Sequence, residues 1–310
     1  MPISVFIDGG AGTTGLDIAG RLGARNDVAL VLLDEARRKD TGARRDAFHA
    51  ADIAILCLPD EAAREAVALA EGSAVRIIDA SSAHRVAPGW VYGFSESAMG
   101  QREAIAAADR VTNPGCYSTG FIALIAPLVA SGLLPRDAGY ICHAVSGYSG
   151  GGKAMIARFE EDRGIAWRGY ALGLDHKHVP EMQARCGLAQ RPLFSPAVIP
   201  AYQGMVVEVP LVRAADARIA PVEELRAALA VRYAGSALVS VGGLSSDGEI
   251  LLRQGAEPSD RLTLDLFASA DGGQIRLVAM LDNLGKGAGG ACVQNLNIMA
   301  GLPETAGLRL

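Results

Sequence analysis

The sequence predicts an α/β protein with a doubly wound, Rossmann-type parallel sheet domain and a second α+β domain. Two observations predict the first domain. Short apolar runs alternate with helical patterns, and a glycine-rich turn separates the first strand from the first helix. One observation predicts the second: after about residue 135 the chain changes to glycine-rich loops and longer strands.

The first domain is expected to contain five strands, at residues 3–7, 28–33, 52–57, 75–79 and 109–112. The uninterrupted apolar run from Ile53 to Cys57 is typical of a parallel strand covered by helices on both faces. Between two of the strands, alanines and a valine recur at helical spacing from Asp60 to Glu71, with charged residues opposite. This alternation favours βαβ units.

The second domain is expected to contain strands at residues 193–200, 205–212, 261–268 and 274–281. The segment from Lys286 to about Met299 has a helical pattern, and we expect it to pack on the first domain. The predicted boundaries are therefore 1–115 for the first domain, with helix 286–310 added to it, and 116–285 for the second.

The composition limits which binding partners and which cellular compartment we expect for this protein. The 310 residues are 50% hydrophobic and carry a net charge of -5, so no basic excess suggests nucleic acid or an anionic membrane. The five cysteines are widely spaced without a CxxC pair, which favours a reducing cytoplasm over disulfides. No signal peptide is expected, and the apolar segment from Phe121 to Leu134 is shorter than the roughly 18–20 residues of a membrane span.

A glycine-rich turn follows the first expected strand. Gly9, Gly12 and Gly15 would let the backbone turn tightly and approach a pyrophosphate. Thr13 and Thr14 lie between them, at the start of a helix that runs to about Leu22. The position predicts dinucleotide binding by these five residues, and the alternative is a turn that is merely tight.

The end of the second strand does not decide which dinucleotide binds. Asp34 stands where an acidic residue would hold the ribose 2′-hydroxyl of NAD, whereas Arg37 and Arg38 could clamp the 2′-phosphate of NADP. The alternative for these basic residues is a solvated loop.

Two further strand ends should lie at the same carboxyl edge of the sheet. Leu58 and Pro59 are expected to line the cofactor crevice. Ser81, His84 and Arg85 follow the next strand, and hydroxyls with an arginine there suit phosphate or carboxylate recognition. We expect Ser81 to contact the cofactor and Arg85 an anionic substrate, with a capped surface loop as the alternative.

A single cysteine lies in a sharply turning motif, Asn113-Pro114-Gly115-Cys116-Tyr117-Ser118-Thr119-Gly120. An apolar helical run follows, so Cys116 should occupy the first turn of a buried helix. Free N–H groups and the helix dipole there favour a thiolate. A buried cysteine after a Pro-Gly turn is the alternative.

A second glycine-rich stretch runs from Ser146 to Lys153. Ser149 and Gly150 with Lys153 offer backbone N–H groups and a cation that could cradle an anionic group. A flexible hinge between domains is the alternative.

The histidines supply the candidate acid/base. His49 lies in a polar patch near the expected surface, and His143 lies within a strand pattern, where a core histidine is expected. In the segment from Asp175 to Glu181, Pro180 predicts a helix start, so Glu181 could orient His178. His178 is favoured over His176, which stays an alternative. The HxH pair has no further ligand cluster, so no metal is expected.

Four motifs in this order resemble the N-acetyl-gamma-glutamyl-phosphate reductase family, especially its short form, over essentially the whole chain. They are the stretches from Asn113 to Gly120, from Ser146 to Lys153 and from His176 to Glu181, and the segment Asn283-Leu284-Gly285-Lys286-Gly287-Ala288-Gly289-Gly290. The family belongs to the aspartate-semialdehyde dehydrogenase-like group.

The resemblance implies an arginine-biosynthesis enzyme that reduces N-acetyl-glutamyl 5-phosphate to the 5-semialdehyde with NADPH and releases phosphate. It gives Cys116 the role of nucleophile and His178 that of acid/base. Asn283, Lys286 and Gly287 become cofactor contacts, and the second domain becomes the catalytic and dimerisation domain. The Cys116 N–H and the Asn113 amide are candidate oxyanion donors.

Two other functions stay open at this point. A related reductase of aspartyl or N-acetyl-aminoadipyl phosphate would share every motif, and a non-catalytic nicotinamide-binding redox sensor could keep the fold. The expected partners are an acyl-phosphate substrate and phosphate, with no nucleic acid and no membrane, in a homodimer or homotetramer.

Overall fold

The computed structural model describes residues 2–245 and 248–310, and it divides into two compact units. Unit 1 comprises Met1–Ser95, Gly100–Pro114 and Ala288–Leu308. Unit 2 comprises Glu96–Met99, Gly115–Gly287 and Arg309–Leu310. Apart from the short segment Glu96–Met99, the chain stays in unit 1 up to residue 114, passes into unit 2, and returns to unit 1 at residue 288.

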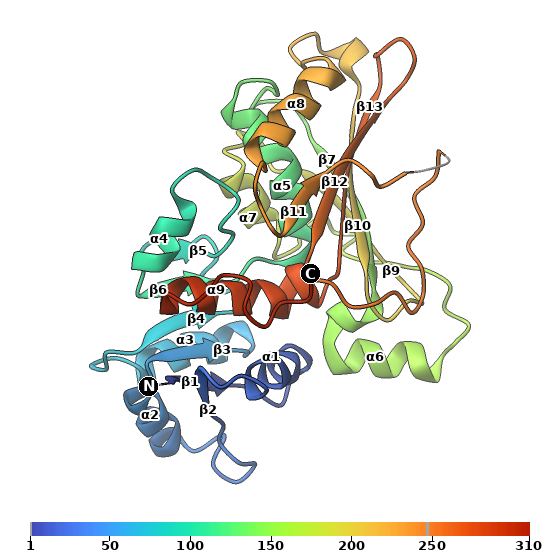
Figure 1. Ribbon diagram of the computed structural model, residues 1–310. Helices are drawn as coiled ribbons and strands as arrows, with labels where there is room; N and C mark the ends of the chain where they lie inside the picture. Colours follow the sequence, from blue (N-terminus) through green and yellow to red (C-terminus); the bar gives the residue numbers. More distant parts are fainter. Residues whose placement is uncertain (1, 246–247) are drawn as a thin grey trace. The chain divides into compact units, whose positions relative to one another are not determined.

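Unit 1 contains one parallel six-stranded sheet in the order β2-β1-β3-β4-β6-β5 (Figure 1). Its strands are β1 (Ile3–Asp8), β2 (Val28–Val31), β3 (Ile53–Leu56), β4 (Arg76–Asp79), β5 (Val91–Tyr92) and β6 (Arg110–Thr112). Its helices are α1 (Thr13–Gly23), α2 (Thr41–Ala50), α3 (Asp60–Leu69), α4 (Gln101–Ala107) and α9 (Gly290–Ala300). The doubly wound parallel sheet predicted from the sequence is confirmed.

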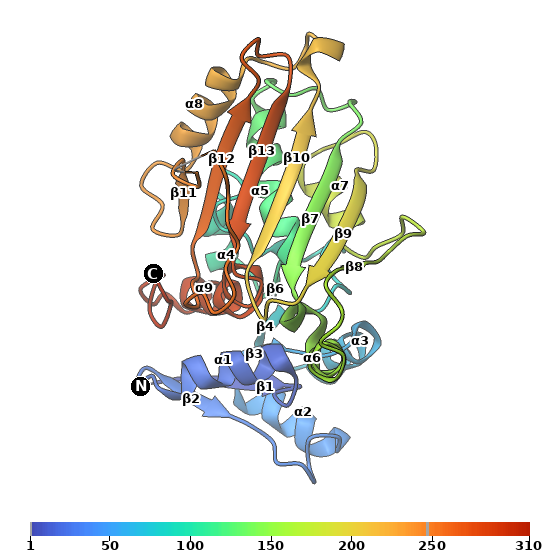
Figure 2. The same cartoon turned by 90° about the vertical axis from the view of Figure 1, so that its right-hand side faces the viewer.

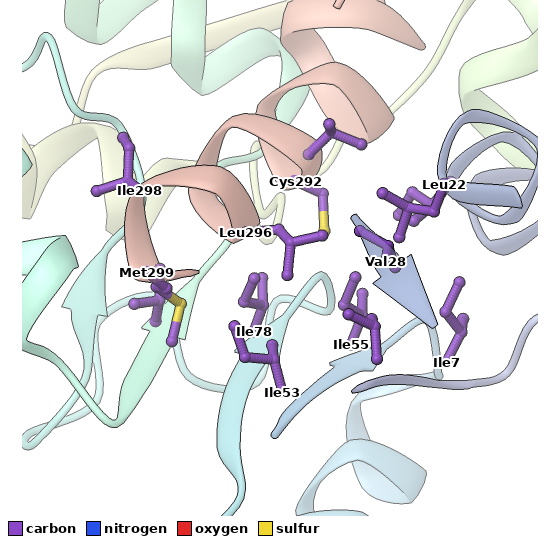
Figure 3. Packing of buried hydrophobic residues seen from close by; sticks show 14 of the residues in the cluster. Ile7, Leu22, Val28, Ile53, Ile55, Ile78, Cys292, Leu296, Ile298 and Met299 are labelled. Carbon is purple, nitrogen blue, oxygen red and sulfur yellow. The ribbon is translucent and has the colours of Figure 1, made fainter. Parts of the chain in front are cut away.

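Helices cover both faces of this sheet, and a separate hydrophobic core lies on each face. On one face, Leu22 of α1 and Leu296 of α9 pack on strand residues such as Ile55 (Figure 3). On the other face, Phe48 of α2 packs among buried residues that include alanines of α3. Because both faces are covered, β3 is buried along its whole length.

Unit 2 contains a mixed seven-stranded sheet in the order β11-β12-β13-β10-β7-β9-β8. Its strands are β7 (Ile141–Gly147), β8 (Arg168–Gly169), β9 (Leu193–Ile199), β10 (Met205–Leu211), β11 (Val239–Val241), β12 (Leu262–Ala268) and β13 (Ile275–Leu281). Its α-helices are α5 (Cys116–Ala130), α6 (Gly152–Glu161), α7 (Val179–Arg185) and α8 (Val222–Arg232). The predicted α+β character of this unit is confirmed.

The helices α5, α7 and α8 lie on one face of this sheet (Figure 2). The central helix α5 is buried at nearly every position from Tyr117 to Leu128, so its first residue is held firmly at the end of a rigid element. Within the described part of unit 2, no helix covers the opposite face (Figure 2).

Candidate active site

Cys116 is the first residue of α5, and Gly115 is its N-cap without a side-chain cap. The first-turn N–H groups at such a helix end favour a negative charge. All five cysteines are free, and Cys142, Cys186 and Cys292 are buried. Burial raises the pKa of each of these three thiols, and it raises the pKa of Cys57 to about 12. Cys116 is half-buried, and it differs from these four thiols, whose raised pKa makes them unreactive.

A carboxylate joins the cysteine helix to a histidine. Glu181, in the first turn of α7, is 1% exposed, and its Oε2 accepts a hydrogen bond of 3.2 Å from the N–H of Gly115. Its Oε1 lies 4.0 Å from Nε2 of His178, the N-cap of α7. Since α5 packs on α7, the tertiary fold brings Cys116, His178 and Glu181 to one helix end.

His176 plays a different structural part from His178. Its Nδ1 accepts a 3.1 Å hydrogen bond from the backbone N–H of His178, and the two rings meet edge to face with centroids 4.7 Å apart. The buried carboxylate lies next to His178, so the geometry favours His178 as the acid/base over His176.

A cavity of about 160 Å³ adjoins the cysteine, and every residue that lines it belongs to unit 2. Its lining includes Cys116, Tyr117, Ser146, Gly150, Arg168 and Tyr170. Burial raises the pKa of Tyr170 to about 12, and it raises that of Tyr117 well above the ordinary value. Sequence reasoning missed Arg168 and Tyr170, because an arginine and a tyrosine in and after a two-residue strand form no motif.

The second glycine-rich stretch lies beside Asn283. Ser149 is buried, and its Oγ accepts a 2.9 Å hydrogen bond from Nδ2 of Asn283. In the described residues, the buried Oδ1 of Asn283 has no hydrogen-bond partner. A Cβ at Gly150 would lie 3.2 Å from Nδ2 of Asn283. A ligand amide could satisfy this orphan acceptor, so the residues fit a nicotinamide carboxamide. Lys153 is exposed at the start of α6.

A π-helical turn, Gly285–Gly289, passes directly against the cysteine. A Cβ at Gly287 would lie 2.8 Å from Cβ of Cys116, so only glycine fits this approach. The ammonium of Lys286 is buried and donates to both carboxylate oxygens of Glu96 at 2.8 Å. This buried ion pair fixes the turn that touches Cys116.

In unit 1, the glycine turn has the geometry of an anion site. Gly9 has a φ of 87°, and a Cβ at Gly15 would lie 2.7 Å from the carbonyl oxygen of Gly9. Gly12 is the N-cap of α1, which begins at Thr13 and Thr14 without a side-chain cap. At Gly12, an added Cβ would come no closer than 3.7 Å to protein atoms. The space beside this glycine is therefore open to a ligand.

The other residues expected at the cofactor lie along the same edge of the sheet. A Cβ at Gly9 would touch Leu58, which precedes Pro59, the N-cap of α3. Arg37 and Arg38 are exposed and form ion pairs with Asp34 and Glu35 respectively. The acidic and basic residues that favoured opposite cofactors are therefore joined in one surface loop.

A hydrogen-bonded network surrounds the end of β4. The carboxylate of Asp79 accepts from the N–H and Oγ of Ser81, both at 2.8 Å, and lies 2.6 Å from Nδ1 of His84. Arg85 is buried, and its Nε donates to the backbone carbonyl of Asn113 at 3.0 Å.

The amide of Asn113 is also engaged within unit 1. Its Nδ2 donates to the carbonyl of Ala288 at 2.9 Å, and its Oδ1 accepts from Asn295 at 3.1 Å. These contacts join the residue that follows β6 to the turn before α9 and to the middle of α9, so this side chain helps to anchor the returning chain.

The expectation of a core position for His143 is wrong. Residues of β7 alternate between the two faces of the sheet, and Cys142 and Ala144 point toward the helices. His143 therefore lies exposed on the helix-free face, 3.6 Å from Glu208. His49 is exposed, as expected.

Two kinds of feature are absent from the described residues. No group of three or more His, Cys, Asp or Glu side chains there could hold a metal. None of the helices in residues 2–245 and 248–310 has the length and apolarity to cross a membrane.

Two family profiles match the chain. "Semialdehyde dehydrogenase, dimerisation domain" matches residues 116–283, and "Semialdehyde dehydrogenase, NAD binding domain" matches residues 33–108. The N-acetyl-gamma-glutamyl-phosphate reductase of Burkholderia ambifaria is 51% identical over 97% of each chain. That of Brucella ovis is 49% identical over 97% of this chain and 100% of its own.

Solved structures share the fold. Aspartate semialdehyde dehydrogenase II of Vibrio cholerae, complexed with ASA, superposes with a TM-score of 0.74 at 15% identity, over 97% of this chain and 98% of that one. The Francisella tularensis enzyme gives a TM-score of 0.66 at 13% identity, over 96% and 100% of the two chains.

Proposed function

Because the chain belongs to the N-acetyl-gamma-glutamyl-phosphate reductase family, we propose that it reduces N-acetyl-L-glutamyl 5-phosphate to N-acetyl-L-glutamate 5-semialdehyde and phosphate, in arginine biosynthesis. The observation that carries the proposal is Cys116 at an uncapped helix end, with Glu181 between that end and His178. A thiolate, a buried carboxylate and an imidazole together suit covalent acyl transfer.

The proposed reaction begins with attack by Cys116. Its thiolate forms a C–S bond with the acyl carbon, the C–O bond to phosphate breaks, and phosphate leaves with the electron pair. The developing oxyanion can accept from the Cys116 N–H at the first helical position of α5. A thioester on Cys116 results.

When bound, NADPH would supply the hydride that reduces this thioester. The C–S bond then breaks, and the thiolate of Cys116 leaves as the aldehyde forms. His178 handles the proton of Cys116 before the attack, with Glu181 orienting its ring. Asn283 and the glycine turn of unit 1 are the proposed holders of the cofactor.

We propose a homodimer or homotetramer in the cytoplasm. The helix-free face of unit 2 supports the assembly, because Ile141 and Leu193 pair across β7 and β9 and are 43% and 45% exposed. The matched profile for residues 116–283 carries the description "dimerisation domain". Five free cysteines suit a reducing compartment.

The direct test follows the reaction in reverse. N-acetyl-glutamate semialdehyde, phosphate and NADP are mixed with the protein, and absorbance of the reduced nicotinamide is recorded. We expect turnover that requires phosphate and exceeds turnover of aspartate semialdehyde and N-acetyl-aminoadipate semialdehyde. A preference for either competitor would overturn the proposed substrate, and absence of turnover with all three would overturn the activity.

A further inference from the structure

The turn that touches Cys116 is itself held by a buried aspartate. Asp282 directly follows β13 and is 7% exposed. Its Oδ1 accepts a 2.8 Å hydrogen bond from the N–H of Leu284, and its backbone carbonyl accepts one of 3.0 Å from the N–H of Gly287. One residue therefore fixes the chain from Leu284 to Gly287, and Gly287 is the glycine that lies against Cys116.

The turn also packs against a fixed wall. A Cβ at Gly285 would lie 2.0 Å from the carbonyl oxygen of Ser259 and 2.9 Å from Oδ1 of Asp260. Asp260 is fully buried and exchanges two hydrogen bonds with Arg309. Its Oδ2 accepts from the backbone N–H of Arg309 at 2.7 Å, and its own N–H donates to the carbonyl of Arg309 at 2.8 Å. Ser259 and Asp260 therefore form a wall against which Asp282 holds the turn.

The charge of Asp282 lowers the stability of the fold. Burial raises the pKa of this carboxyl above its ordinary value of 3.8, and the nearby charge of Asp260 adds to the rise, although backbone N–H groups oppose it. The folded protein therefore binds this proton more tightly than the unfolded chain does, so the ionised carboxylate lowers stability at neutral pH. A buried charge with this effect is characteristic of functional sites.

The contact with Gly287 limits the orientation of the Cys116 side chain. A Cβ at Gly287 would lie 2.8 Å from Cβ of Cys116 and 3.4 Å from its Cα. Backbone atoms this close to Cβ restrict the staggered positions that are open to Sγ. The direction of Sγ relative to the cavity and to the first-turn N–H groups of α5 therefore depends on where the turn lies.

We propose that Asp282 is a positioning residue for Cys116. Its carboxylate and its carbonyl hold Gly287 against the cysteine, and the turn keeps Sγ in the orientation for attack. Asp282 acts through Gly287 and not on the reacting atoms. The inference rests on the proposed function for the role of Cys116 as nucleophile.

The first experiment needs no substrate. Alkylation of Cys116 by iodoacetamide is followed over a range of pH by mass spectrometry of the modified peptide. The pH midpoint of the rate reports how strongly the protein stabilises the thiolate, and it does not depend on how easily the reagent enters. We expect the midpoint to rise by about 0.5–1 pH unit in Asp282→Ala, because Sγ is no longer held beside the helix-end N–H groups.

Asp271 supplies the matched control. Its Oδ1 accepts a 2.9 Å hydrogen bond from the N–H of Gly273, two residues further on, as Asp282 accepts from Leu284. Asp271 is exposed and precedes β13, whereas Asp282 follows that strand. Asp271→Ala removes the same kind of turn contact at the opposite end of the strand, so it should leave the alkylation midpoint unchanged.

The second experiment measures turnover in the reverse reaction. A misplaced nucleophile lowers the rate of the chemical step, so we expect Asp282→Ala to lower kcat about 10- to 100-fold. The KM values for N-acetyl-glutamate semialdehyde and phosphate should change less than about threefold. Asp282→Asn keeps an acceptor for the N–H of Leu284 and should recover most of the lost kcat.

Thermal melts check that each variant is folded. If Asp282→Ala does not fold, Asp282→Ser replaces it, and its shorter side chain should give a smaller rise of the midpoint in the same direction. An unchanged midpoint in the folded variant would overturn the proposal, as would an equal change in Asp271→Ala. A raised midpoint in Asp282→Ala, together with a wild type that does not turn over the semialdehyde, would retain the positioning role and reject the proposed function.

Discussion

At the scale of single residues, the surroundings of each cysteine decide its chemistry. Burial in apolar cores raises the pKa of Cys142, Cys186 and Cys292, so these thiols stay protonated. Cys116 lies at a helix end whose N-cap, Gly115, has no side-chain cap, and a cavity adjoins it. One sequence therefore contains both structural and reactive thiols, and only position distinguishes them.

Removal of the nucleophile should separate catalysis from binding. We expect Cys116→Ser to lower kcat at least about 10³-fold, because serine is not ionised at neutral pH. NADPH affinity, measured by fluorescence titration, should stay within about twofold. Residual turnover above a few per cent of the wild type would contradict covalent catalysis through Cys116.

Tyr170 gives a prediction for alkaline pH. Burial raises its pKa from an ordinary value of 10.0 to about 12, so the folded protein keeps a proton that the unfolded chain releases in this interval. Stability should therefore fall as pH rises from 10 to 12, by up to about 1.4 kcal/mol per pH unit from this group. Urea denaturation of Tyr170→Phe at several pH values should show a shallower fall than the wild type, and an identical fall would contradict the assignment.

At the scale of elements, the π-helical turn Gly285–Gly289 is the segment on which the cysteine depends most closely. Gly287 touches Cys116, Lys286 is anchored by Glu96, and Asn283 reaches Ser149. A short turn thus connects the reactive helix end to the second glycine-rich stretch. The helical pattern from Lys286 did not indicate these contacts, and the family resemblance predicted Asn283, Lys286 and Gly287 as cofactor contacts.

Substitution of Gly287 tests this packing. A Cβ there would come within 2.8 Å of Cys116 Cβ, so we expect Gly287→Ala to cost about 1–3 kcal/mol of stability and most of the activity. Gly20→Ala in α1 is the matched control, since a Cβ at Gly20 meets nothing within 4 Å. The control should gain about 0.5–1 kcal/mol, because alanine favours helices. Equal behaviour of the two variants in denaturation and rate assays would contradict the close approach.

At the scale of the whole molecule, each unit brings its candidate functional residues together at one edge of its own sheet. In unit 1 the carboxyl ends of parallel strands collect the glycine turn, Leu58, Ser81 and Arg85. In unit 2 the helices cover one sheet face, and within the described residues no helix covers the other (Figure 2). The proposed oligomer would bury that second face.

The assembly face can be tested without touching the site. Leu193 is 45% exposed on β9, so Leu193→Arg should leave the fold intact while a cation opposes burial of this face. We expect analytical ultracentrifugation to show a lower mass for the variant than for the wild type, with an unchanged circular dichroism spectrum. Equal masses would place the interface elsewhere.

Local patterns were enough to predict most elements. Apolar runs placed the strands near residues 3–7, 193–200 and 205–212, and the structure has them at Ile3–Asp8, Leu193–Ile199 and Met205–Leu211. The short strands β5 and β8 were not predicted, because two residues cannot show a period. The position of His143 was predicted wrongly, since a strand pattern does not say which of its faces is covered.

By itself, the sequence determined the fold class, the glycine turn and the placement of Cys116 at the start of a buried helix. These features depend on neighbouring residues, through hydrophobic periodicity and the backbone preferences of glycine and proline. Only the tertiary structure decided that Glu181 meets the N–H of Gly115, that Gly287 touches Cys116, and that Arg168 enters the cavity. These partners lie 52 to 171 residues apart along the chain, so their contacts depend on how helices and strands pack rather than on any local pattern.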